Sequence, residues 1–144
     1  MRTSLTPRVH PEFEGFWEGC RIGELRVQQC TNCQEVRFPA QPLCPVCRST
    51  GREWVAAEGT GTVYTYSINT GQGAAGAILP GEHGFPYAVA VIELDSGPRM
   101  YSDFDTEDLP RLVIGARVHV VFDDIGGGMI GPNFALTDPA VPAT

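Results

Sequence analysis

From about Glu53 onward the chain shows a repeated pattern of short apolar segments separated by polar turns. Four segments there are rich in β-branched and aromatic residues, which favour strands: residues 61–70, 87–94, 99–104 and 116–122. A weaker segment of the same kind covers residues 133–138, and the polar stretch 106–112 predicts a turn or a short helix. Five short strands with one interruption predict a small closed β-barrel, and the OB-fold is the five-stranded form of that architecture.

Near the N-terminus the apolar spacing is helical instead. Phe13, Phe16 and Trp17 stand at positions i, i+3 and i+4, so they share one face of a short helix. Gly15 and Gly19 lie within the same stretch, and each weakens a helix by about 1 kcal/mol relative to alanine. A helix of so few turns is not stable alone, so its aromatic face must pack on another surface.

Two C-x-x-C pairs lie between these regions, Cys30 with Cys33 and Cys44 with Cys47, separated by ten residues. Four thiolates surround Zn²⁺ tetrahedrally at about 2.3 Å when each pair occupies a tight turn, called a knuckle. The alternative of free or redox-active cysteines fits this spacing less well. Because four protein ligands fill the coordination sphere, the predicted zinc is structural. Iron in a rubredoxin-like site uses the same ligands, so the sequence leaves that alternative open.

Cys20 has no partner at ligand spacing and is expected to be a packed thiol.

The composition favours a metal site over disulfides. The chain has 144 residues, 42% of them hydrophobic, which is enough for one domain or a small domain with an added module. We find neither a signal-peptide pattern nor an apolar run approaching the ~20 residues of a membrane span, so we expect a cytoplasmic protein. Thiols are kept reduced in that compartment, and an odd number of cysteines would leave one unpaired.

Charge is distributed unevenly along the chain. Residues 1–52 hold seven arginines against five acids, whereas residues 53–144 hold three arginines against twelve acids, so the two parts carry +2 and −9. A zinc ribbon beside an OB barrel raises the alternative of a module that binds single-stranded nucleic acid. Such binding needs a basic groove, and the predicted barrel is acidic, so we expect no nucleic-acid partner.

Catalytic motifs are absent from the sequence. There is no G-x-S-x-G, H-E-x-x-H or P-loop pattern, and of the three histidines only His83 lies in a loop suited to a functional role. Residues 71–76, GQGAAG, have the glycine spacing of a dinucleotide site. Pro80, Gly81 and Gly84 follow too soon for the helix that such a site requires, so this stretch predicts a long loop between the first two barrel strands.

Several segments together resemble a known family. They are FWEGCRIGELRVQQC, which runs into CTNCQEVRFPAQPLCPVC, then GTGTVYTYSI, FPYAVAVIEL and IGARVHVVF. In this order they are similar to the zinc-ribbon/OB-fold proteins found beside thiolase-superfamily enzymes, a family known as a domain of unknown function. The resemblance implies a mainly β protein with an N-terminal helical segment (1–28), a rubredoxin-like zinc ribbon (29–52) and a five-stranded OB-fold domain (53–144). It also implies that Cys30, Cys33, Cys44 and Cys47 are the metal ligands.

The resemblance further implies a non-catalytic role. Family members act as accessory subunits of thiolases, or of aldolases that cleave steroid-CoA side chains, in some cases together with an enoyl-CoA hydratase subunit. The chemistry on the CoA thioester is then done by the thiolase-fold partner, with no membrane contact. The chain by itself is not expected to be an enzyme.

Some residues acquire expected roles from this resemblance. Phe13, Phe16 and Trp17 form an aromatic face that would contact the partner, although packing on the chain's own ribbon is an equally good interpretation. Arg37, His83 and Phe85 are expected to lie near CoA or the acyl channel.

The sequence departs from the family pattern after each knuckle. The family usually has glycine following the second cysteine, where the backbone favours a positive φ, but here Gln34 and Arg48 occupy those positions.

Overall fold

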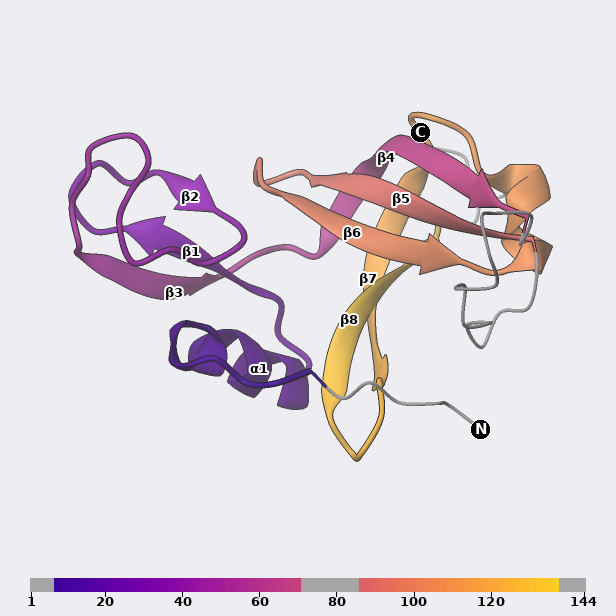
Figure 1. The fold of residues 1–144 in the computed structure, drawn as a ribbon. Coiled ribbons are helices and arrows are strands. Elements are labelled where there is room, and N and C mark those ends of the chain that lie inside the picture. The colour runs from indigo at the N-terminus through magenta and orange to yellow at the C-terminus, as the bar shows by residue number, and fades with distance from the viewer. Residues whose placement is uncertain (1–6, 71–85, 138–144) are drawn as a thin grey trace.

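The computed structural model describes residues 7–70 and 86–137, and it divides into a helix, a small sheet and a larger sheet (Figure 1). The predicted loop at residues 71–85, which includes the GQGAAG motif, lies outside the described residues. No helix within the described ranges is long and apolar enough to cross a membrane.

The helical segment begins with a 3₁₀ turn, η1 (Pro11–Phe13), and continues as α1 (Glu14–Arg21). The side chain of His10 caps this start by accepting a hydrogen bond from the backbone N–H of Glu12 at 3.2 Å. The two glycines of α1 face crowded surfaces: a Cβ on Gly15 would lie 2.3 Å from Trp54 Cδ1, and one on Gly19 would lie 2.6 Å from a backbone oxygen. These glycines therefore let the helix approach its neighbours closely, although glycine lowers intrinsic helix propensity.

A three-stranded antiparallel sheet follows the helix. Its order is β2 (Val36–Arg37), β1 (Arg26–Cys30) and β3 (Arg52–Ala56), with β1 in the centre. The sequence pattern does not predict these strands, because they are short and carry several polar residues. β3 pairs with β1 along its whole length, so the ribbon sheet continues as far as Ala56.

The second sheet has five antiparallel strands in the order β6-β5-β4-β7-β8. Their bounds are β4 (Thr60–Asn69), β5 (Tyr87–Leu94), β6 (Arg99–Phe104), β7 (Arg117–Asp124) and β8 (Ile130–Leu136), with the 3₁₀ helix η3 (Thr106–Arg111) between β6 and β7. The prediction of five strands with one interruption is thus confirmed, although the last strand begins three residues earlier than expected. Strands alternate between buried and exposed residues, for example along β5 and β6, because one face of the sheet covers the core.

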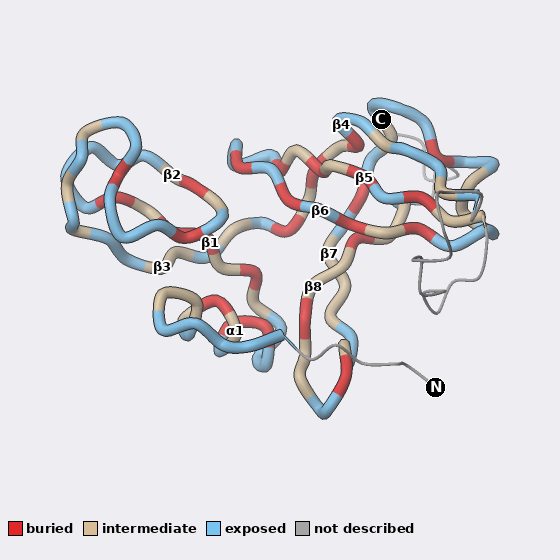
Figure 2. The backbone as a smooth tube through the Cα atoms, in the orientation of Figure 1, coloured by how far each residue is buried: buried red, intermediate tan, exposed pale blue. Residues whose placement is uncertain are grey.

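One hydrophobic core spans these parts, and buried positions occur in the helix, the small sheet and the larger sheet (Figure 2). Phe16 and Cys20 of α1 and Val27 of β1 belong to the same buried cluster as Ile92 and Phe104 of the OB sheet. The end of the β7–β8 hairpin lies beside α1, and contacts between α1 and β8 join the two regions (Figure 1). The three segments predicted from the sequence therefore share one core.

Candidate metal centre and partner-facing residues

Each C-x-x-C pair forms a tight turn held by backbone hydrogen bonds. The N–H of Gln34 donates to the carbonyl of Cys30 at 3.1 Å, and the N–H of Arg48 donates to the carbonyl of Cys44 at 2.9 Å. A further bond from the N–H of Cys30 to the carbonyl of Glu35, at 2.9 Å, anchors the first knuckle to the end of β1. The two knuckles thus have the same construction, although their sequences differ.

The residues that close the knuckles adopt the left-handed backbone conformation expected there. Gln34 has φ 68° and Arg48 has φ 62°, and they are the non-glycine residues with positive φ in the described ranges. A side chain at such a φ costs about 1–2 kcal/mol, because Cβ approaches the following carbonyl oxygen. The fold therefore holds a positive φ at both positions although neither residue is glycine.

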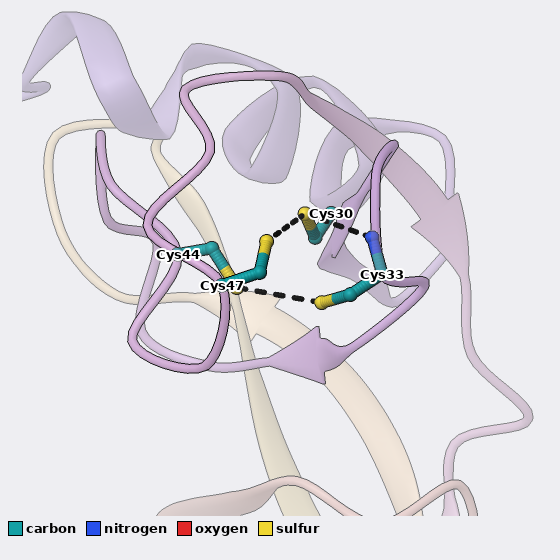
Figure 3. Close-up of side chains that lie close together, drawn as sticks. All are labelled: Cys30, Cys33, Cys44 and Cys47. Atoms are coloured by element: carbon teal, nitrogen blue, oxygen red, sulfur yellow. Dashed lines mark hydrogen bonds between the residues drawn. The ribbon is translucent and has the colours of Figure 1, made fainter.

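The four cysteine sulfurs converge between the knuckles (Figure 3). Sγ of Cys30 lies 3.6 Å from Sγ of Cys47, and Sγ of Cys33 lies 3.6 Å from Sγ of Cys44, with all four sulfurs within 4.8 Å of one another. A tetrahedral ion with metal–sulfur distances of about 2.3 Å places its sulfurs about 3.8 Å apart. The structure thus positions the four cysteines to bind one metal ion.

The electrostatics of the cluster also fit a cation. The backbone N–H groups of Cys33 and Asn32 point at the Cys30 sulfur and lower its pKa to about 6, and the N–H of Cys47 likewise lowers the pKa of Cys44. The N–H of Glu35 acts in the same direction on Cys33, but burial and the neighbouring sulfurs outweigh it and raise the pKa of Cys33 to about 12. Four adjacent thiols cannot all ionise in isolation, because each thiolate repels the next, and a bound cation removes this conflict.

Cys20 is separate from this cluster. It is 1% exposed on the inner face of α1, and burial raises the pKa of its thiol to about 11. The thiol therefore stays protonated near neutral pH, as expected for a packing residue rather than a nucleophile.

The aromatic face predicted on the helix packs largely inside the chain. Phe16 is 4% exposed, and its ring centroid lies 5.0 Å from that of Trp17 and 5.3 Å from that of Phe38. The Phe13 ring meets the rings of Phe16 and Phe38 edge-on, with both centroid distances 6.4 Å. Of our two interpretations, packing on the ribbon describes Phe16, whereas Phe13 and Trp17 remain only partly buried.

Trp17 borders a hollow of about 360 Å³ between α1 and the β7–β8 hairpin. Apolar side chains from both sides line it, with two glutamates and an arginine from α1: Val9, Glu14, Trp17, Glu18, Arg21, Met129 and Ile130. Within the predicted aromatic face, Trp17 is thus the residue that borders this hollow.

Arg37 is buried rather than exposed, with 7% of its surface accessible. Its Nε donates to Gln28 Oε1 at 2.6 Å and its Nη2 to the carbonyl of Gln41 at 3.1 Å, while Nη1 has no hydrogen-bond partner among the described residues. Gln28, itself 1% exposed, also accepts from the N–H of Gln41 at 2.9 Å, so it fixes the loop between the knuckles. The strand pattern gave no signal of this role, because glutamine on a strand is usually solvent-facing.

The other two residues expected near CoA, His83 and Phe85, lie outside the described residues. Arg37 lines a hollow of about 480 Å³ between the ribbon and the β5–β6 turn, together with Phe38 and Pro98. Contact between CoA and any of these three residues stays a prediction.

Comparison with known proteins matches both parts of the fold. Residues 17–53 match the family model described as "ChsH2, rubredoxin-like zinc ribbon domain", and residues 54–123 match "ChsH2, C-terminal OB-fold domain". A "DUF35 domain-containing scaffold protein" from Methanocaldococcus jannaschii is 38% identical over 104 residues, which cover 72% of this chain and 67% of that protein. The chain belongs to the DUF35 family of zinc-ribbon/OB-fold proteins. The rubredoxin-like ribbon and OB domain predicted from the sequence are thereby confirmed, and the two family models meet at residues 53 and 54.

Two further matches have names that refer to enzymes. A "probable enoyl-CoA hydratase alpha subunit" from Thermomonospora curvata is 32% identical over 138 residues, which cover 94% of this chain but only 40% of that protein. Among solved structures, a chain of the "Ltp2-ChsH2(DUF35) aldolase" superposes with a TM-score of 0.72 at 26% identity, over 91% of this chain and 98% of that chain. The fold of this DUF35 chain is therefore shared, nearly end to end, with a subunit of an aldolase complex.

Proposed function

We propose that this chain is a non-catalytic accessory subunit of an enzyme that processes acyl-CoA or steroid-CoA thioesters. The observation that carries the proposal is the superposition on the aldolase-complex chain, which covers nearly all of both chains. The curated hydratase relative supports the same substrate class, because its name refers to an enoyl-CoA. A thiolase-superfamily enzyme, either a thiolase or an aldolase, is the partner that the family resemblance suggests.

Zinc is the ion we assign to the four-cysteine cluster, and its role is structural. Sulfur ligands in a tetrahedral arrangement suit Zn²⁺, and four of them leave no position for a water nucleophile. Metal binding then supplies folding free energy to the ribbon, whose sheet has a two-residue strand on one side.

The zinc assignment is tested by metal analysis of two cysteine variants. Cys44→Ser removes a buried ligand, and we expect loss of zinc and unfolding of the ribbon. Cys20→Ser is the matched control, because Cys20 is also buried but lies outside the cluster, and it should retain one zinc per chain. If Cys44→Ser keeps both its metal and its fold, the four-thiolate assignment is wrong. If metal analysis of the wild type finds iron instead of zinc, the identity of the ion is wrong.

The accessory role is tested by co-expression with a thiolase-fold enzyme encoded nearby. We expect a stable complex in size-exclusion chromatography, together with no turnover of CoA thioesters by the isolated chain. Failure of the chain either to co-purify with such an enzyme or to change its activity would contradict the proposal. Turnover by the isolated chain, lost on replacement of His83, would instead make it an enzyme.

The alternative of nucleic-acid binding is tested by a mobility shift with a single-stranded oligonucleotide. We expect no shift, because a phosphate-binding groove needs clustered basic side chains and residues 53–144 carry a net −9. Binding that weakens steeply with salt would favour the alternative.

A further inference from the structure

The OB barrel has a seam between β6 and β8, the two outer strands of its sheet. Both strands are paired on one side only within the described ranges, β6 with β5 and β8 with β7, although they contact each other. Side chains take the place of ladder hydrogen bonds: Ser102 Oγ donates to Asn133 Oδ1 at 2.6 Å and accepts from the N–H of Phe134 at 3.1 Å. The N–H of Asp103 also donates to Asn133 Oδ1, at 3.2 Å. The barrel is therefore closed by a buried polar link rather than by continuous strand pairing.

A hollow of about 340 Å³ lies along this seam. Its lining comes from β5, β6, the end of β7 and β8, and it combines apolar side chains with two carboxylates: Val89, Tyr101, Asp103, Asp123, Ile125 and Pro132. Val89 is the cross-strand neighbour of Asp103, and Val91 that of Tyr101, so these four side chains share the outer face of the sheet.

Two side chains of this seam hollow are prominently available. Tyr101 is 77% exposed, the largest exposed fraction among the exposed large hydrophobic residues of the described ranges. Asp123 is exposed at the end of β7. Among the described residues, no basic side chain lies within 4.0 Å of its carboxylate. By contrast, Arg99 on the same sheet stacks 3.7 Å above the centre of the Tyr64 ring and pairs with Glu93 at 3.0 Å. Those charged side chains therefore already have partners within the chain.

We propose that the seam hollow docks a segment of the partner enzyme in which an arginine or lysine stands beside an apolar side chain. The cation would approach Asp123, and the Asp103 carboxylate, which already accepts a hydrogen bond from Asn133 Nδ2 at 2.7 Å, would add negative charge nearby. The apolar side chain would lie against Tyr101 and Val89. Charge carries the choice of partner, because two carboxylates line the hollow and residues 53–144, to which it belongs, have a net charge of −9, so an acidic segment would be repelled. Tyrosine is enriched among the residues that dominate interface energies.

This inference rests on the proposed accessory role, and the experiment separates the two. The affinity of the zinc-loaded chain for the purified partner enzyme is measured by titration calorimetry for the wild type and for Tyr101→Ala and Asp123→Lys. We expect each variant to bind at least about tenfold more weakly, with a stronger effect of Asp123→Lys at low salt. Glu58→Lys is the control, because Glu58 is an exposed acid outside the hollow and makes the same charge change, and it should bind as the wild type does.

Circular dichroism and zinc content check that the variants fold. We expect them to fold, because the replaced side chains are exposed. If the wild type binds the enzyme and both variants bind equally well, the docking site is wrong while the accessory role stands. If the wild type itself does not bind, the accessory role fails, and the docking proposal fails with it. Self-association of the chain that is lost in Tyr101→Ala would overturn the choice of occupant in favour of a second copy.

Discussion

At the scale of single residues, each knuckle places a residue other than glycine at a backbone position that favours glycine. Gln34 and Arg48 occupy positive-φ positions that favour glycine, yet both carry long side chains. The side chain of Gln34 partly offsets the strain, since its Nε2 donates to the carbonyl of Thr31 at 3.4 Å. The backbone N–H bonds to the carbonyls of Cys30 and Cys44 hold both residues in this conformation.

Replacement of Arg48 by glycine should therefore stabilise the chain. Glycine removes a cost of about 1–2 kcal/mol in the folded state, and its greater freedom in the unfolded state takes back about 0.5–1 kcal/mol. We expect a net gain of about 0.5–1 kcal/mol, measured as a higher midpoint in urea unfolding of the metal-loaded protein. Arg48→Ala keeps the Cβ and is the control that should show no such gain. A loss of stability in Arg48→Gly would show that contacts of the arginine side chain stabilise the fold by more than the positive φ costs.

At the scale of elements, α1 depends on close approach rather than on its intrinsic propensity. Gly15 lies against the ring of Trp54 in β3, and Arg26 of β1 donates to the carbonyl of Gly15 at 3.2 Å. The two glycines that weaken an isolated helix thus allow this helix to pack tightly on the ribbon sheet.

Gly15→Ala should destabilise the protein although alanine is the better helix former. Overpacking costs about 1–3 kcal/mol, and alanine returns about 1 kcal/mol of propensity, so the net loss is up to about 2 kcal/mol. This loss lowers the Tm by several degrees in a thermal melt. Glu18→Ala, at an exposed position of the same helix, should leave the Tm nearly unchanged. An unchanged Tm in Gly15→Ala would mean that Trp54 can move aside without cost.

A second link between elements joins the β5–β6 turn to β4 and β7. Asp95 accepts hydrogen bonds from Arg117 Nη1 and Nη2, at 2.8 and 2.7 Å, and from Thr60 Oγ1 at 2.7 Å. The bonds from Arg117, followed by that from Thr60, lower the pKa of Asp95 to about 2. Because the folded pKa lies below the ordinary value of 3.8, the ionised form stabilises the fold above about pH 4.

This stabilisation should disappear as the pH falls through about 2. We expect the wild type to be more stable than Asp95→Asn near neutral pH and the two to converge in acid. The difference should be under about 1 kcal/mol, because both partners are more than a third exposed and water screens the pair. Urea unfolding of both proteins at each pH cancels any common effect of metal loss. A difference that grows in acid would reverse the assigned sign.

At the scale of the whole molecule, the sequence predicted the OB strands better than the ribbon. The strands β5 and β6 appear at their predicted bounds because buried positions alternate with more exposed ones along both, and the polar turn 95–98 separates them. The strands of the ribbon sheet could not be predicted, because they are short and show no regular apolar pattern. The outer strands β2 and β3 are held by their pairing with the central strand β1 and by the loops that carry the cysteines.

The candidate site was predictable only where chemistry fixes spacing. The two C-x-x-C pairs predicted the sulfur cluster, since ligand geometry constrains sequence directly. The burial of Arg37 by Gln28 and the exposure of Tyr101 were not predictable, because both depend on neighbours that are distant along the chain. One continuous core joins the helix, the ribbon and the barrel, so metal loss in the ribbon should weaken any interface that spans these parts.

The proposed accessory role means that this chain completes a partner enzyme without performing chemistry itself. The most direct measurement adds increasing amounts of the purified, zinc-loaded chain to the purified thiolase-fold enzyme and records the turnover of an acyl-CoA substrate. We predict a rise in activity that saturates at a fixed ratio of the two proteins, with no turnover by the chain alone. An enzyme rate that stays unchanged, with no complex formed at the same concentrations, would contradict the proposed accessory role.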